Sequence, residues 1–134
     1  MAELSRIVDS MEYDGLISGL TPKVKVTGGT IRKLDSESTL ERGTILARSS
    51  GTAGDDKLVV LGTTAASNET LTADCILADD ITVGDGEDVN VAVYDMGCFD
   101  PDKVKVADGY TITAADKDAL RQRGIYFASK SDAN

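Results

Sequence analysis

The sequence contains no histidine and no tryptophan, and only 4% of its residues are aromatic. Histidine is the commonest general base near neutral pH, so its absence excludes the Ser-His and Cys-His arrangements of nucleophilic enzymes. The scarcity of aromatic side chains means that the core must be built mainly from Val, Ile, Leu and Ala. These absences favour a protein that binds over one that catalyses.

Cysteine is also scarce, since the chain has only Cys75 and Cys98. They form no CxxC pair, and two thiols without histidine cannot complete a tetrahedral zinc site. Each lies in an apolar stretch, so we interpret both as small buried hydrophobic residues. A disulfide between them would require an oxidising compartment. The sequence therefore predicts no metal site.

Long apolar runs are missing as well. None could span a bilayer, and the N-terminus lacks the charged and apolar regions of a signal peptide. We expect a protein that is made in a cytoplasm and either stays there or leaves inside an assembly. Lys and Arg total 14 against 23 Asp and Glu, which gives a net charge of −9. That sign argues against nucleic acid and against an anionic membrane as partners.

Positive charge is absent from one long stretch, because no Lys or Arg lies between Leu58 and Asp102. We interpret this stretch either as a solvated acidic face or as a surface that meets a basic partner. Within it, Gly84–Asp88 lacks the ligand spacing of an EF-hand, so it is predicted to be a β-turn between strands. The ten acidic residues of the stretch are Glu69, Asp74, Asp79, Asp80, Asp85, Glu87, Asp88, Asp95, Asp100 and Asp102.

The length of 134 residues predicts a single domain that buries roughly 65–70% of its unfolded surface. Residues 1–22 are predicted to form an extended arm, because their apolar residues keep neither a helical nor a strand period for long. Such a segment rarely packs well on its own domain but can order against a partner, and a frayed terminus or a leading short helix is the alternative interpretation. Residues 23–127 are predicted to form a β-rich domain, and residues 128–134 a flexible tail.

Short strand patterns alternate with turn-forming residues through the predicted domain. The segments Lys23–Thr27 and Thr30–Leu34 are expected to be strands joined by a turn at Gly28-Gly29. Further strands are predicted at Thr44–Arg48, Lys57–Leu61, Cys75–Ala78, Val89–Tyr94 and Ile125–Phe127, with exposed loops at Ser49–Asp56 and Gly62–Thr70.

One helix is predicted, beginning after Thr113 and ending at Gly124. Thr113 and Asp116 have capping-box spacing, and glycine suits the residue that follows a helix. Arg121 and Arg123 in the last turn complement the helix dipole. The predicted fold class is therefore mainly β with one short helix (α+β), as a small β-barrel or a folded sandwich.

No catalytic constellation is present in the sequence. Neighbouring strand carboxylates such as Asp79 and Asp80 point to opposite faces, and the glycine pairs form no phosphate-binding loop. We therefore expect a non-enzymatic protein without a cofactor. Two other readings stay open: a carbohydrate-binding or adhesin-like β-module displayed on a virion or cell, and a trimeric cytoplasmic enzyme with its active site between subunits.

Segments distributed along most of the chain resemble, in order, the lambda-type bacteriophage head decoration proteins, also called capsid cement proteins. No single segment is specific, so their order and content carry the resemblance. The polar loops at Ser49–Asp56 and Thr63–Thr70 and the extended tail depart from the family pattern. The resembling segments are Tyr13-Asp14 with Leu16-Ile17, Arg42–Leu46, Cys75–Asp80, Val91–Tyr94 and Gly109–Gly124.

The resemblance implies a β-tulip-like domain that binds the major capsid protein on the outer surface of an expanded capsid. It implies homotrimers at three-fold and quasi-three-fold positions that stabilise the shell against the pressure of packaged DNA. The protein would be made in the host bacterial cytoplasm, and its arm would order on the shell by adding a strand. The implied capsid contacts are Tyr13, Leu16, Ile17, Leu20, Lys23, Val24, Lys25 and Val26.

Overall fold

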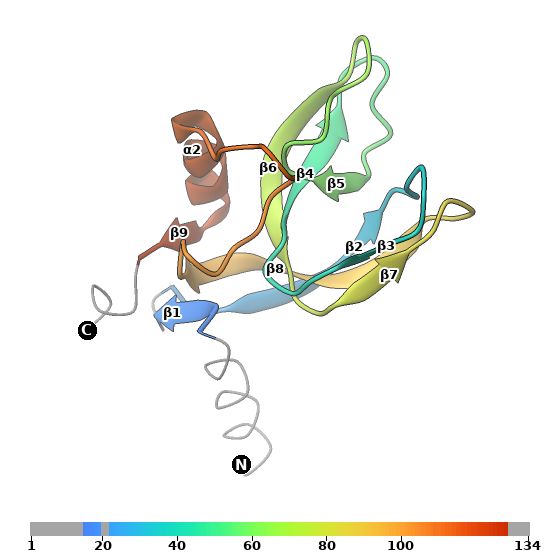
Figure 1. Ribbon diagram of the computed structural model, residues 1–134. Coiled ribbons are helices and arrows are strands. Elements are labelled where there is room, and N and C mark those ends of the chain that lie inside the picture. Colours follow the sequence, from blue (N-terminus) through green and yellow to red (C-terminus); the bar gives the residue numbers. More distant parts are fainter. Residues whose placement is uncertain (1–14, 20–21, 129–134) are drawn as a thin grey trace.

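The computed structural model describes residues 15–19 and 22–128, which form a mainly β domain with one short helix (Figure 1). The predicted fold class is therefore confirmed. Within the described residues, no helix has both the length and the apolar character needed to cross a membrane. The strands are β1 (Ile17–Gly19), β2 (Lys25–Ile31), β3 (Ser38–Leu40), β4 (Ile45–Ser50), β5 (Leu58–Val60), β6 (Thr70–Leu77), β7 (Ile81–Val83), β8 (Val89–Phe99) and β9 (Ile125–Phe127), and the helix is α2 (Ala114–Arg123).

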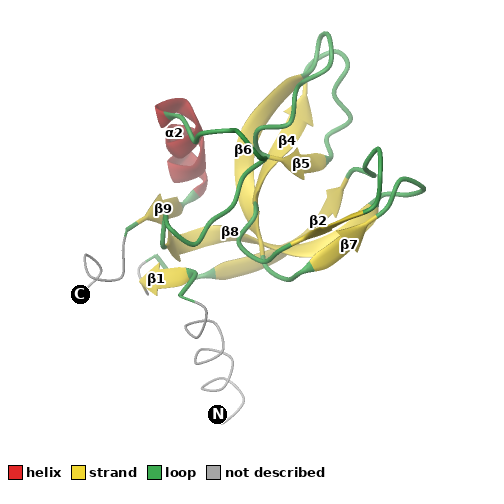
Figure 2. Cartoon of the chain, in the orientation of Figure 1, coloured by secondary structure: helices red, strands yellow, loops and turns green. Residues whose placement is uncertain are grey.

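Strands β2, β5, β4, β6 and β8 form a closed barrel (Figure 2). Neighbouring strands in this order are antiparallel except β2 and β5, which are parallel. The barrel closes where Ile76 and Leu77 of β6 pair with Tyr94 and Val93 of β8. Beyond the barrel, β8 continues between β1 and β9, because Phe99 pairs with a residue of each. This continuation brings both ends of the described chain to one end of the molecule.

Strands β3 and β7 form a separate two-stranded ribbon. The sequence analysis did not predict either strand, because each is only three residues long and their pairing partners lie about forty residues apart. A hydrogen bond of 3.1 Å between the hydroxyl groups of Thr39 and Thr82 links them. The ribbon covers a second core, whose members include Leu46 and Val83.

The core is split into two clusters by strands that are buried on both faces. In β4, Ile45 and Ala47 lie in the larger cluster, whereas Leu46 between them lies in the smaller one. Successive strand residues point to opposite faces, so a strand covered on both sides reads as a continuous apolar run. The same arrangement buries Cys75 in the smaller cluster, and desolvation raises the pKa of its thiol. Both Cys75 and Cys98 are buried free thiols, as predicted.

Helix α2 follows the sequence prediction closely. The Thr113 hydroxyl accepts a hydrogen bond from the Asp116 N–H at 3.1 Å, and the Asp116 carboxylate accepts one from the Thr113 N–H at 3.0 Å. Gly124 ends the helix in the left-handed conformation, with φ +102°. Leu120 is fully buried and attaches the helix to the larger cluster. Ile125 then enters β9 directly.

The prediction of a turn at Gly28-Gly29 is wrong, because β2 runs through both glycines as one strand. A side chain at Gly29 would place its Cβ 2.7 Å from Leu58 Cδ1, whereas no heavy atom lies within 4 Å of the equivalent position at Gly28. Both glycines are extended because they pair with Ala92 and Val91 of β8, and a Cβ at position 29 would force the Leu58 side chain to shift. Local sequence cannot reveal this, since Leu58 is distant in the chain.

This difference predicts opposite effects of one substitution at two neighbouring positions. Gly29→Val should destabilise the domain by about 1–3 kcal/mol, because it overpacks the contact with Leu58. Gly28→Val should be neutral or stabilising, because a β-branched residue suits an exposed strand position. Urea unfolding of the two variants measures both effects. Equal destabilisation by both substitutions would indicate a turn and contradict a continuous β2.

Candidate functional site

The predicted capsid contacts Leu16 and Ile17 are packed into the domain itself. Their side chains are 2% and 5% exposed and belong to the larger core cluster. Ile17 pairs with Phe99 of β8, and the carbonyl of Leu16 accepts a hydrogen bond from the Asp100 N–H at 2.8 Å. The segment from Leu16 to Gly19, which was expected within the arm of residues 1–22, is therefore part of the folded domain.

Leu16-Ile17 is an apolar run of only two residues between Gly15 and Gly19, shorter than the runs of about four or more that indicate a buried strand. Its burial follows from pairing with β8, which the local sequence does not reveal. Ser18 is also buried, and its hydroxyl lies 3.5 Å from Cys98 Sγ. Tyr13 and Leu20, the other contacts predicted in the arm, lie outside the described residues.

The remaining predicted contacts lie just before β2 and at its start, and β2 pairs with β8 as β1 does. Lys23 and Lys25 are exposed, and Val24 between them packs partly against the larger cluster. Val26 is 50% exposed and, with Tyr126, is one of the two exposed large hydrophobic residues in the described part of the chain. The structure thus brings Lys23–Val26 close to the root of the arm and leaves most of this segment accessible.

One backbone edge of β2 is largely open. On one side, β2 pairs with β8 along its whole length. On the other side it pairs with β5 through Ile31 alone, so among the described residues no strand pairs with this edge from Lys25 to Thr30. Unpaired backbone groups on an edge strand are ready acceptors and donors for another strand.

A β-bulge lies at the same place. The register between β2 and β8 shifts between Lys25 and Val26, which pair with Met96 and Tyr94, so Asp95 has no partner residue on β2. Its Oδ1 atom is buried and has no hydrogen-bond partner. A buried carboxylate oxygen without a donor is costly, so this position favours the approach of a donor group.

The acidic stretch is not a uniformly solvated face. Among the ion pairs within the described residues, three of its ten acids bind cations that lie outside the stretch in the sequence. Asp88, in the turn between β7 and β8, is one of these three acids. Within the described residues, no group of three Cys, Asp or Glu side chains is arranged to hold a metal ion. The cross-links are Arg32–Glu69, Arg48–Asp74, Arg123–Asp74 and Lys57–Asp88.

Comparison with known protein families gives one decisive match. The family model of bacteriophage lambda head decoration protein D matches residues 9–126. The chain belongs to this family. A comparison with curated proteins gave no match. The matched range includes β1, the open edge of β2 and the whole barrel.

Family membership indicates a structural role in a phage head. The chain therefore has a role in decorating a phage capsid. The resemblance found in the sequence is thereby confirmed. The buried Leu16 and Ile17, the exposed Lys23–Val26 segment and the open edge of β2 together form the candidate capsid-binding end of the domain.

Two alanine substitutions test the packing at this end. Leu16→Ala should destabilise the domain by about 2–4 kcal/mol, because it leaves a cavity in the core. Val26→Ala should change stability by less than about 0.5 kcal/mol, because the side chain is half exposed. Chemical denaturation measures both. A Leu16→Ala variant as stable as the unmodified protein would show that this residue is not part of the core.

Proposed function

We propose that this decoration protein binds the outer surface of the expanded capsid as trimers at three-fold and quasi-three-fold positions. The bound trimers stabilise the shell against the pressure of packaged DNA. Membership of the head decoration family supports the capsid as the partner. The location of the N-terminal strand and the open β2 edge at one end of the domain supports that end as the attachment point.

Attachment is divided between two groups of residues. The arm, with Tyr13 and Leu20, contacts the shell together with Lys23–Val26. Leu16 and Ile17 hold the root of the arm on the domain, a role supported by their burial and their position beside β8. A load on the arm is then transmitted directly into the barrel, because β1 is hydrogen-bonded to the strand that closes it.

The open edge of β2 accepts an extended segment of the major capsid protein. Strand addition gains main-chain hydrogen bonds along Lys25–Thr30. The guest strand ends before Ile31, where β5 already occupies the edge. Val26, which is half exposed, gives the guest strand an apolar contact.

The opposite end of the molecule is directed away from the shell in this arrangement. The loops that join β4 to β5 and β5 to β6 project from the barrel away from β1 (Figure 1). These are the polar loops that depart from the family pattern. Their position supports a surface role, since they can vary without disturbing attachment.

Stabilisation follows from linkage. A protein that binds only the expanded lattice lowers the free energy of that lattice, by an amount that grows with the logarithm of its free concentration. Each bound trimer bridges neighbouring capsomers, and many sites on one shell multiply the effect. The decoration protein therefore needs no chemistry of its own to resist internal pressure.

Removal of the arm upstream of Gly15 tests this proposal. A variant lacking residues 1–14 retains Leu16 and Ile17, so it should unfold cooperatively like the full chain. Its binding to expanded, undecorated capsids of the cognate phage should weaken by roughly 100-fold or more, which corresponds to about 2.7 kcal/mol. Co-sedimentation measures the binding, and unexpanded shells serve as the control.

A longer deletion provides the matched comparison. Removing residues 1–19 also removes β1 and the core side chains of Leu16 and Ile17, so this variant should lose stability as well as binding. Binding of the 1–14 deletion at full affinity would contradict the role of the arm. Failure of the full chain to bind expanded shells would contradict the proposed function itself.

A further inference from the structure

The weakest backbone junction of the barrel lies between β2 and β5. These parallel strands share a single residue pair, Ile31 with Leu58, supplemented by a hydrogen bond of 2.9 Å from the Arg32 N–H to the Leu58 carbonyl. By contrast, β2 pairs with β8 through all seven of its residues. Side chains of Ile31 and Leu58 pack beneath this junction in the smaller core cluster. We call it the β2–β5 seam.

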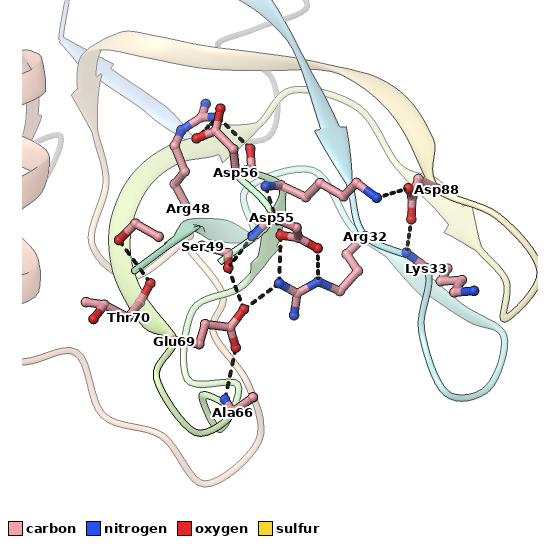
Figure 3. A network of polar contacts seen from close by, with 12 residues as sticks. Arg32, Lys33, Arg48, Ser49, Asp55, Asp56, Ala66, Glu69, Thr70 and Asp88 are labelled. Carbon is pink, nitrogen blue, oxygen red and sulfur yellow. Dashed lines mark hydrogen bonds and ion pairs between the residues drawn. The ribbon is translucent and has the colours of Figure 1, made fainter. Parts of the chain in front are cut away.

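Arg32 crosses the seam with the densest set of ionic contacts in Figure 3. Its Nε and Nη2 atoms donate to the two carboxylate oxygens of Asp55, both at 2.8 Å. Nη2 also donates to Glu69 Oε2 at 2.5 Å. Asp55 lies in the loop before β5 and Glu69 immediately before β6, so one guanidinium joins the end of β2 to two loops. Bidentate Arg–carboxylate pairs are the strong, geometrically specific kind.

The two carboxylates are held in place by further donors. Glu69 accepts hydrogen bonds from the Ala66 N–H at 2.9 Å and from the Ser49 hydroxyl, and with Arg32 these lower its pKa to about 2. Arg32 is the main cause that lowers the pKa of Asp55 to about 2. Stability from such lowered pKa values is present above the ordinary carboxyl pKa and is lost as the pH falls towards 2. The contacts therefore persist throughout the neutral range.

A second ionic contact lies on the other side of the seam. Lys57, which directly precedes β5, places Nζ 2.5 Å from Asp88 Oδ2, directly before β8. Asp88 Oδ1 also accepts a hydrogen bond from the Lys33 N–H at 2.9 Å, just beyond β2. This pair raises the pKa of Lys57 and lowers that of Asp88. Asp88, directly before β8, therefore links the start of β5 to the end of β2.

We propose that the β2–β5 seam is the line along which the barrel opens, and that the ionic cluster of Arg32, Asp55, Glu69, Lys57 and Asp88 controls this opening. Elsewhere in the barrel, backbone ladders would have to break before two strands separate. At the seam, side-chain charges supply most of the directional contacts. The apolar packing of Ile31 and Leu58 is the same with and without the ionic contacts, so changes in the ionic cluster alter how often the seam opens.

A double variant with unchanged net charge tests, in the full chain, whether the ionic cluster controls opening of the seam. Asp55→Asn with Lys57→Gln removes the bidentate pair and the Lys57–Asp88 pair without changing the net charge, and Asn retains an oxygen that can accept the Lys57-position N–H. The matched control is Glu41→Gln with Lys105→Gln. It removes an exposed ion pair, with 3.6 Å between Lys105 Nζ and Glu41 Oε2, that lies away from the seam. Hydrogen exchange of individual amides is followed by NMR.

The Arg32 amide, which bonds across the seam, should exchange roughly tenfold or more faster in the seam variant than in the control, as expected for selective local opening. Amides of the β2–β8 and β4–β6 ladders should keep their rates. Raising the salt to 1 M, where the screening length is about 3 Å, should accelerate the Arg32 amide selectively in the unmodified protein. An unchanged Arg32 rate in both experiments, or equal acceleration of all core amides, would overturn the proposal. If the double variant does not fold, the salt experiment alone decides between these outcomes.

Discussion

The pairing of β8 is the constraint on which the rest of this structure depends. Its first part pairs with β2 and β6 and so closes the barrel, and its last part lies between β1 and β9. One continuous strand therefore connects the core to both ends of the described chain. The bulge at Asp95 marks the passage from one role to the other. Loss of this pairing would release the barrel and the root of the arm together.

This arrangement gives a decoration protein two mechanically different sides. At the end with β1, pairing of Ile17 and Gly19 with β8 and the burial of Leu16 and Ile17 anchor the segment that the proposed function assigns to the shell. At the β2–β5 seam, a single residue pair is reinforced by ionic contacts among Arg32, Asp55 and Glu69. Part of the excess negative charge is thus neutralised by ion pairs within the domain. In these pairs, acids from the stretch without Lys or Arg bind cations from other parts of the chain.

Local rules predicted the local features of the fold. The capping box at Thr113 and the glycine that ends α2 depend only on nearby residues, and both are confirmed. The turn expected at Gly28-Gly29 is wrong because pairing with the distant strand β8 holds both glycines in an extended conformation. The burial of Leu16-Ile17 likewise depends on β8, some eighty residues later. For the candidate site, resemblance gave the family and the arm, whereas the open β2 edge required the strand order.

The orientation of the bound protein is the most direct test of the account. A cryo-electron microscopy reconstruction of expanded capsids saturated with the full chain would reveal which end of the barrel faces the shell. The account predicts that β1 and the Lys25–Thr30 edge of β2 lie against the major capsid protein, with the β4–β5 and β5–β6 loops directed outward. Contact through those loops, with β1 and the β2 edge facing solvent, would contradict it.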